Sequence, residues 1–220
     1  MNFSQLSLKG GKTAGAAYIS NDADIGRAVE RLQIPHPVNV IVLVGGAGGI
    51  TALDESAVKK AVAIVARLAE ETGSVVIDGG TQAGIMTEIG SQRKHNGFSF
   101  SLVGVVIDSL LARKEAQSAL DPNHTHFFLI PGQNWGDESV WISKIATHIA
   151  GNKKSITVLV NGGRISRTDV EHSLSANRPA FVMRGTGRMA DEITLSRNIS
   201  AIDISKKAEE IHEMLRARLS

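Results

Sequence analysis

Cysteine is absent from the 220-residue chain, and aromatic residues make up only 4% of it. The absence of cysteine excludes disulfides and thiolate chemistry, which is typical of a reducing compartment. The shortage of aromatic side chains argues against a surface that stacks the bases of single-stranded nucleic acid. The formal net charge of +2 is also too small to indicate nucleic-acid binding by itself. We therefore expect no nucleic-acid partner.

Long apolar runs are missing as well. A membrane-spanning helix needs roughly 20 consecutive apolar residues, whereas the longest runs here, residues 41–44 and 102–107, have the length of a strand. Residues 1–20 lack the apolar stretch of a secretory signal. We expect a cytoplasmic protein without membrane insertion, and its length fits one α/β domain.

Short runs rich in β-branched residues alternate with amphipathic segments along most of the chain. The predicted strands are residues 39–44, 74–77, 102–107, 127–130, 156–160 and 180–183. Helices are predicted between a capping pair, Thr51 and Asp54, and Gly73, and then at 83–94, 138–150, 168–176, 188–196 and 205–219. Nearly continuous apolar strands are typical of a parallel sheet with both faces covered. The alternation predicts an α/β fold with a doubly wound, mostly parallel sheet and helices on both faces.

The first part of the chain has a different pattern. Residues 22–32 are compatible with a helix that has an acidic first turn, and Pro35 and Pro37 then favour an extended entry into the first core strand. We interpret residues 1–38 as an N-terminal extension and residues 39–220 as the ligand-binding domain.

Glycine pairs end three of the predicted strands, and a Gly-Thr-Gly sequence ends a fourth. These residues are Gly45 and Gly46, Gly79 and Gly80, Gly162 and Gly163, and Gly185, Thr186 and Gly187. In a parallel sheet such ends lie along one edge, where open α/β folds bind ligands. Glycine lets the backbone approach a ligand closely, and the N–H groups of the next helix bind anions. Tight turns explain any single pair, but four together favour a phosphate site.

Two common phosphate motifs do not fit. A P-loop ending in Lys12 and Thr13 would need a glycine where Leu6 stands. The dinucleotide fingerprint that Gly46 would begin has Thr51 at its third glycine position. A hydride-transfer enzyme of the usual dinucleotide type is therefore poorly supported.

Basic residues lie beside the last two glycine loops. They are Arg164, Arg167, Arg184 and Arg188. Each is compatible with a solvated basic face, but arginine also binds phosphate oxygens in a bidentate manner. We favour a functional role for Arg188, because it lies within the Gly-Thr-Gly-Arg sequence.

Other polar residues have simpler interpretations. His124 and His126 would share one face of a strand, but a zinc site needs three or four ligands and no partner cluster is evident, so we expect no metal. Asp137 and Glu138 suit the start of a helix, which is a structural role. Trp135 suits either an adenine contact or cover for the sheet edge.

Four strings resemble the SLOG superfamily, and within it the LSDAT branch. They are DGGTQAGIM at residues 78–86, LDPNHTHF at 120–127, NGG at 161–163 and GTGRMAD at 185–191. The branch includes prokaryotic stand-alone proteins and the cytosolic N-terminal region of melastatin-type transient receptor potential channels, and the resemblance covers residues 40–193. It implies a Rossmann-like fold and a site for a nucleotide-derived ligand, with ADP-ribose and its cyclic relatives the leading class. It places Gly79, Gly80, Thr81, Gly84, Gly163, Gly185, Thr186 and Arg188 in that site.

The superfamily also contains the lonely-guy phosphoribohydrolases, whose pattern is Pro-Gly-Gly-x-Gly-Thr-x-x-Glu. Residues 161–169 here are NGGRISRTD, so the proline, the third glycine, the threonine and the catalytic glutamate are all changed. Asp169 keeps a carboxylate, but its side chain is one methylene shorter. Such a change can misplace a general acid or base, although it does not exclude catalysis.

Two functions follow from these patterns. The first is a sensor that binds a nucleotide-derived molecule such as ADP-ribose, needs no other cofactor, and passes its signal to an effector protein or through a homo-oligomer. The alternative is an N-glycosidic nucleotide hydrolase with Asp169 or Glu171 as its acid or base. The altered glutamate position favours the sensor. The predicted ligand-binding residues are Gly45, Gly46, Gly79, Gly80, Thr81, Gly84, Gly162, Gly163, Arg164, Gly185, Thr186, Gly187 and Arg188.

Overall fold

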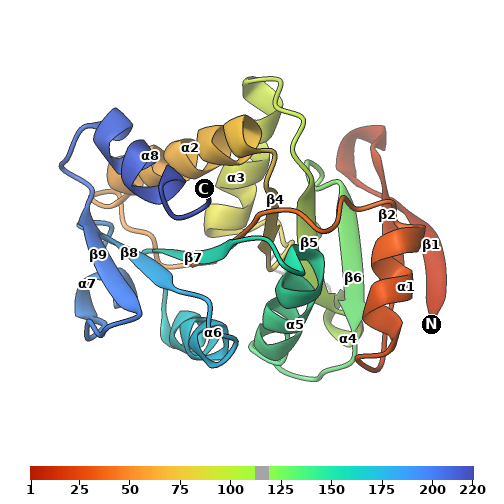
Figure 1. Ribbon diagram of the computed structural model, residues 1–220. Helices are drawn as coiled ribbons and strands as arrows, with labels where there is room; N and C mark the ends of the chain where they lie inside the picture. The colour runs from red at the N-terminus through yellow and green to blue at the C-terminus, as the bar shows by residue number, and fades with distance from the viewer. Residues whose placement is uncertain (112–118) are drawn as a thin grey trace.

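The computed structural model describes residues 1–111 and 119–220, and its strands form one sheet (Figure 1). Within the described residues, the nine strands lie in the order β1-β2-β6-β5-β4-β3-β7-β8-β9. They are β1 (Asn2–Ser7), β2 (Thr13–Tyr18), β3 (Val40–Gly45), β4 (Val75–Asp78), β5 (Leu102–Ile107), β6 (His126–Ile130), β7 (Ser155–Val160), β8 (Ala180–Arg184) and β9 (Ile199–Asp203). Among these nine described strands, only the β1–β2 pair is antiparallel. The predicted mostly parallel sheet is confirmed.

Helices cover both faces of this sheet. They are α1 (Asp24–Arg31), α2 (Glu55–Thr72), α3 (Gly84–His95), α4 (Asp108–Leu111), α5 (Ser139–Ala150), α6 (Arg164–Ser175), α7 (Met189–Glu192) and α8 (Ala208–Arg216), with a short 3-10 turn, η1, at Lys9–Gly11. Figure 1 shows α2, α3 and α8 on one face and α1, α5 and α6 on the other. The fold is Rossmann-like and doubly wound, as predicted. No helix in the described part of the chain is long and apolar enough to cross a membrane.

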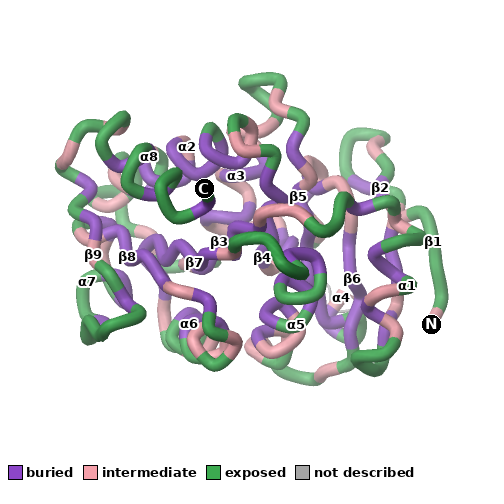
Figure 2. The backbone as a smooth tube through the Cα atoms, viewed as in Figure 1, coloured by how far each residue is buried: buried purple, intermediate pink, exposed green. Residues whose placement is uncertain are grey.

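Alternation along the strands divides the core into two layers. Val40, Val42 and Val44 of β3 pack towards the α5 face, whereas Ile41 and Leu43 pack towards α2. All five side chains are buried, and Figure 2 shows the buried residues concentrated along the sheet. A strand buried on both faces reads as a continuous apolar run, which is why β3 was predictable.

Several elements differ from the prediction. Residues 1–38 supply β1, β2 and α1 to the sheet and its core, although the sequence pattern predicted only the helix. β9 was not predicted either. The helix predicted at 188–196 is the short α7, and α6 begins at Arg164 instead of residue 168. The earlier start has a local cause, because Gly163 caps α6 and its N–H donates to the hydroxyl of Ser166 at 3.2 Å.

The strand order places a crevice beside β3. The chain moves outward from β3 through β4 and β5 to β6, and it then returns to β7 on the other side of β3. Loops leaving β3 and β7 therefore diverge to opposite faces. Open α/β sheets bind ligands at this kind of switch point, outside the carboxyl ends of the strands.

Candidate functional site

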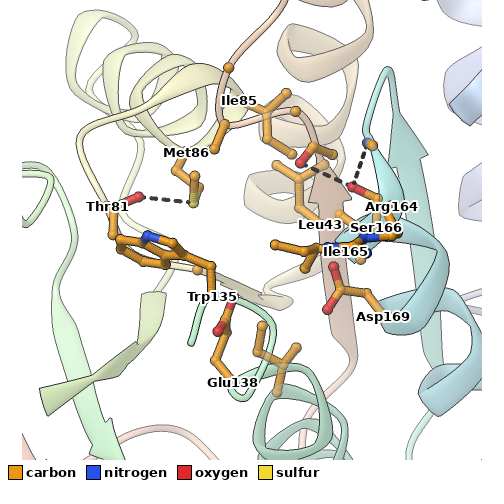
Figure 3. A pocket seen from close by; sticks show the side chains of 18 of the residues that line it. Leu43, Thr81, Ile85, Met86, Trp135, Glu138, Arg164, Ile165, Ser166 and Asp169 are labelled. Atoms are coloured by element: carbon orange, nitrogen blue, oxygen red, sulfur yellow. Dashed lines mark hydrogen bonds between the residues drawn. The ribbon is translucent and has the colours of Figure 1, made fainter. Parts of the chain in front are cut away.

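A cavity of about 360 Å³ lies at this switch point, and we call it the edge cavity (Figure 3). Its walls come from β3, from α3, α5 and α6, and from the loops that follow β3, β4, β6, β7 and β8. The lining residues are Leu43, Val44, Gly45, Gly46, Ala47, Gly48, Gly79, Thr81, Ile85, Met86, Trp135, Glu138, Ile142, Gly163, Arg164, Ile165, Ser166, Asp169 and Arg188. The sheet edge predicted from the glycine-ended strands is thus the edge that carries a cavity.

Two glycines, Gly45 and Gly84, allow neighbouring backbone segments to approach closely beside the cavity. A Cβ on Gly45 would strike the carbonyl oxygen of Val160, and one on Gly84 would strike the carbonyl oxygen of Gly46. Gly84 also has a φ of +47°, a conformation that other residues rarely adopt. Its neighbour Ile85 donates its N–H to that Gly46 oxygen at 3.1 Å. Gly84 thus brings the start of α3 against the loop after β3.

The N-terminus of α6 forms another wall of the cavity. Ser166 fixes this turn, because its hydroxyl accepts from the Gly163 N–H and donates to the Gly45 carbonyl, each at 3.2 Å. The first helical residues, Arg164, Ile165 and Ser166, all line the cavity. The first N–H groups of a helix have no partner within the helix, and the helix dipole adds a partial positive charge there. This wall is therefore suited to an anion.

Arg188 joins the loops that follow β3 and β7. Its Nη1 donates to the carbonyl oxygen of Gly48 at 2.6 Å and lies 3.5 Å from Oδ1 of Asn161. A Cβ built on Gly163 would lie only 2.9 Å from Nη2, so the guanidinium passes directly over that glycine. The residue is exposed at the cavity mouth. A cation therefore stands beside the N-terminus of α6.

The Gly-Thr-Gly loop before Arg188 is held from behind the cavity. Asp191 accepts the N–H groups of Gly185 and Gly187 at 2.6 and 2.9 Å. Thr186 is fully buried, and its hydroxyl donates to the Met183 carbonyl at 2.7 Å. These hydrogen bonds fix the backbone of the loop and therefore the position of Arg188 at its end.

The predicted site residues therefore separate into two groups. Those that line the cavity are Gly45, Gly46, Gly79, Thr81, Gly163, Arg164, Asp169 and Arg188. Those that do not line it are Gly80, Gly84, Gly162, Glu171, Gly185, Thr186 and Gly187. Gly80 faces β5 and β6, since a Cβ there would lie 2.7 Å from the Cα of Gly104. Glu171 is exposed on α6.

A buried cluster of Asp78, Asp121 and His124 supports the loop after β4, and we call it the Asp-His-Asp cluster. The His124 Nε2 lies 2.8 Å from Asp78 Oδ1, and its Nδ1 lies 3.1 Å from Asp121 Oδ1. Burial lowers the pKa of His124, but the two carboxylates outweigh this effect and raise it to about 9. Asp78 also accepts the Gly80 N–H at 2.7 Å. A charged histidine therefore fixes the strand end beside the cavity.

The structure separates the two histidines that the sequence predicted on one face of a strand. His124 precedes β6 and belongs to the Asp-His-Asp cluster, whereas His126 begins β6 and its Nδ1 lies 2.8 Å from the Thr125 hydroxyl. Within residues 1–111 and 119–220, no group of three or more histidine, cysteine or acidic side chains is arranged to hold a metal ion.

Two carboxyl groups, those of Glu138 and Asp169, stand in the cavity wall. Burial raises the pKa of Asp169 to about 7; the nearby Ser139 hydroxyl opposes this rise, and the charge of Glu138 adds to it. Burial also raises the pKa of Glu138, against hydrogen bonds from backbone N–H groups. Both groups therefore hold protons more tightly than free carboxyls do.

Sequence reasoning assigned Glu138 a structural role at the start of a helix and did not place it in the cavity wall, where the structure has it. It does stand at the N-cap of α5, where its Oε2 accepts the Gly136 N–H at 2.8 Å. The signal available in the sequence was position, because Glu138 follows β6 at the same sheet edge as the glycine loops. Trp135 lines the same side of the cavity.

Comparisons with known proteins agree with this architecture. A solved X-ray structure, the structural genomics target TM1055, aligns with a TM-score of 0.58 at 17% identity and covers 80% of this chain and 99% of its own. A likeness at this identity shows the fold.

Sequence relatives come from cation channels. Over 70% of this chain, the sequence is 24% identical to a transient receptor potential cation channel subfamily M member-like 2 of Nematostella vectensis. Over 64% of this chain, it is 22% identical to the transient receptor potential cation channel subfamily M member 2 of Rattus norvegicus. The alignments span only 13% and 12% of the two channels.

The family described as "SLOG in TRPM, prokaryote" (LSDAT) matches residues 38–218. This range contains every residue that lines the edge cavity. The match covers most of the chain and confirms the resemblance seen in its motifs, and the protein therefore belongs to the prokaryotic SLOG-in-TRPM family.

Proposed function

We propose that the protein binds a phosphate-bearing, nucleotide-derived small molecule in the edge cavity. The observation that carries this proposal is the meeting of the α6 N-terminus with Arg188 at the cavity mouth. Burying phosphate charge requires oriented N–H groups or cations, and this corner supplies both. Arginine adds the ability to hold two phosphate oxygens at once.

The rest of the cavity suits the other parts of such a ligand. Leu43, Ile85, Met86 and Ile142 supply apolar surface, and Trp135 supplies an aromatic one. Apolar walls with a few placed polar groups are typical of small-molecule sites. A base or a sugar ring fits this environment better than a free inorganic anion does. ADP-ribose and its relatives are the ligand class that we propose, with an effector protein or a second copy of the chain receiving the signal.

Addition of ADP-ribose is expected to raise the melting temperature of the protein. A ligand that binds only the folded state stabilises it by RT ln(1 + [L]/Kd), which is about 2.7 kcal/mol at a hundredfold excess over Kd. Differential scanning fluorimetry with ADP-ribose, AMP and sodium phosphate measures the effect. A shift with phosphate equal to that with both nucleotides would argue for an anion site without nucleotide recognition. No shift with any of the three would contradict the proposal.

A second candidate, an N-glycosidic nucleotide hydrolase, is favoured by the surroundings of Asp169. Its Oδ1 is buried and has no hydrogen-bond partner among the described residues. With its pKa raised to about 7, it is suited to transfer a proton at neutral pH. Glu171, the other candidate acid or base, is exposed and does not line the cavity. We favour binding over hydrolysis, because Asp169 is one methylene shorter than the glutamate of the hydrolases.

We expect no release of free base or ribose phosphate when the protein is incubated with AMP, ADP-ribose or NAD. Chromatography of the reaction mixtures over several hours measures this. The matched control is Asp169→Asn, which keeps the shape of the side chain but removes its acid–base function. Product that forms with the wild type and disappears in Asp169→Asn would establish the hydrolase instead.

A further inference from the structure

The edge cavity has a second polar region besides the corner at Arg188. Glu138 on α5 and Asp169 on α6 stand in its wall, and Figure 3 shows both carboxyl groups on the same side of the cavity. The buried Oδ1 of Asp169 makes no hydrogen bond among the described residues; the Ser139 hydroxyl lies close enough to lower the Asp169 pKa, but it too is without a hydrogen-bond partner there. A buried acceptor without a donor is costly, so a ligand that supplies the donor gains binding energy there.

We propose that Glu138 and Asp169 form a subsite for the ribose hydroxyls of the bound nucleotide, so that the protein selects ribonucleotides over deoxyribonucleotides. This inference rests on the proposed function, because it assumes that the phosphate lies at the N-terminus of α6. It goes beyond that function by assigning a role to Glu138 and by naming the part of the ligand that is discriminated.

Spacing along α6 places the subsite at the distance of a sugar. The helix begins at Arg164 and carries Asp169 five residues later, which corresponds to roughly 8 Å at the helical rise of 1.5 Å per residue. One sugar ring with its 5′ carbon bridges this span from a phosphate at the first turn. A whole nucleoside is longer, so the base extends past the carboxyl groups. Trp135 and the apolar wall of the cavity are then available to contact the base.

The chemistry of the two groups also matches a diol. An ionised carboxylate only accepts hydrogen bonds, whereas a protonated carboxyl also donates one. Burial raises the pKa of both groups, and the charge of Glu138 raises the pKa of Asp169 further. Near neutral pH the pair therefore offers both a donor and acceptors. A pair of hydroxyls, each of which donates and accepts, is complementary to this arrangement.

The orientation of Glu138 is set before a ligand arrives. Its Oε2 accepts the Gly136 N–H at 2.8 Å, and its position at the N-cap of α5 places the charge at the favourable end of the helix dipole. A side chain that is already held loses little conformational freedom on binding. Glu138 is thus positioned to discriminate between sugars.

The test compares AMP with 2′-deoxy-AMP and 3′-deoxy-AMP by isothermal titration calorimetry. We expect wild-type protein to bind AMP about tenfold more tightly than at least one deoxy analogue, the effect of losing one hydrogen bond to a charged group. In Glu138→Ala this ratio should fall towards one. The matched control is Glu30→Ala, which removes an exposed carboxylate on α1 and should leave the ratio unchanged.

The ratio of AMP affinity to deoxy-analogue affinity distinguishes a role of Glu138 in ribose recognition from a purely structural role. A purely structural role for Glu138 would weaken AMP and both deoxy analogues equally and leave the ratio intact, and that outcome would overturn the inference. Equal wild-type affinity for all three nucleotides would also overturn it, while the proposed function would stand. Failure of every nucleotide to bind would remove the proposed function and this inference together. Chromatography of each titrated sample checks that the AMP is recovered intact.

Discussion

His124→Ala is expected to lower the free energy of unfolding by about 3–5 kcal/mol, the cost of breaking a buried ion pair by removing one partner. His124 lies fully buried between Asp78 and Asp121, at 2.8 and 3.1 Å. Without the imidazole, the two carboxylates face each other in a site shielded from water. Each already has one buried oxygen, Oδ2, without a partner among the described residues. Urea denaturation at pH 6.5 measures the change.

The same cluster predicts a pH dependence. The folded-state pKa of His124, about 9, lies above the ordinary value of 6.5, so the folded protein binds the proton more tightly than the unfolded chain does. The stabilisation is fully present below pH 6.5 and is lost as the pH rises through 9. The difference between wild type and His124→Ala should therefore shrink between these values.

His95→Ala provides the matched control for this variant. His95 is exposed in the last turn of α3, and its replacement should change stability by no more than about 0.5 kcal/mol. A destabilisation by His124→Ala no larger than that of the control would mean that the histidine does not neutralise the two aspartates. A difference that stays constant from pH 6 to pH 10 would contradict the assigned charge.

Arg188→Ala is expected to weaken ADP-ribose binding by roughly 30- to 1000-fold, which corresponds to about 2–4 kcal/mol. The side chain supplies the cation beside the α6 N-terminus and also ties the loop after β3 through its 2.6 Å bond to Gly48. Arg188→Lys should recover only part of the affinity, because lysine lacks the planar fork that holds two oxygens. Calorimetry on both variants measures the losses.

Arg197→Ala controls for a general loss of positive charge. Arg197 is exposed before β9 and does not line the edge cavity. Its removal should leave the affinity unchanged at moderate salt, where surface charges are screened. If Arg188→Ala bound as tightly as the wild type, the phosphates would lie elsewhere and the Gly-Thr-Gly-Arg loop would have only a structural role.

The central part of the fold was predictable because its strands carry their own signal. β3 and β5 are continuous apolar runs, and burial on both faces imposes that pattern. β2 has the sequence TAGAAY, in which alanine and glycine have little preference for strands. Its place in the sheet depends on pairing with β6, where Gly15 lies opposite His126. Pairing with a strand so distant in the sequence cannot be predicted from the residues of β2 themselves.

The candidate site shows the same division. The glycine-ended strands predicted the sheet edge that carries the edge cavity, since parallel strands end together. The same residues did not reveal which glycines face the cavity. Gly80 has a φ of +65° and packs against β5 and β6, whereas its neighbour Gly79 lines the cavity. A positive φ needs glycine for conformational reasons in either case, so the residue type cannot distinguish a binding role from a packing role. Whether a residue at this edge lines the cavity depends on the direction of its side chain or backbone in the folded protein, as it does for Glu138.

The most direct test of the account is a crystal structure of the protein with ADP-ribose bound. The account predicts a phosphate at the N-terminus of α6, within hydrogen-bond distance of backbone N–H groups of residues 164–166 and of the Arg188 guanidinium. It also predicts ribose hydroxyls beside Glu138 and Asp169. A phosphate bound outside the edge cavity, for example in the smaller surface groove lined by Lys59 and Glu88, would contradict it.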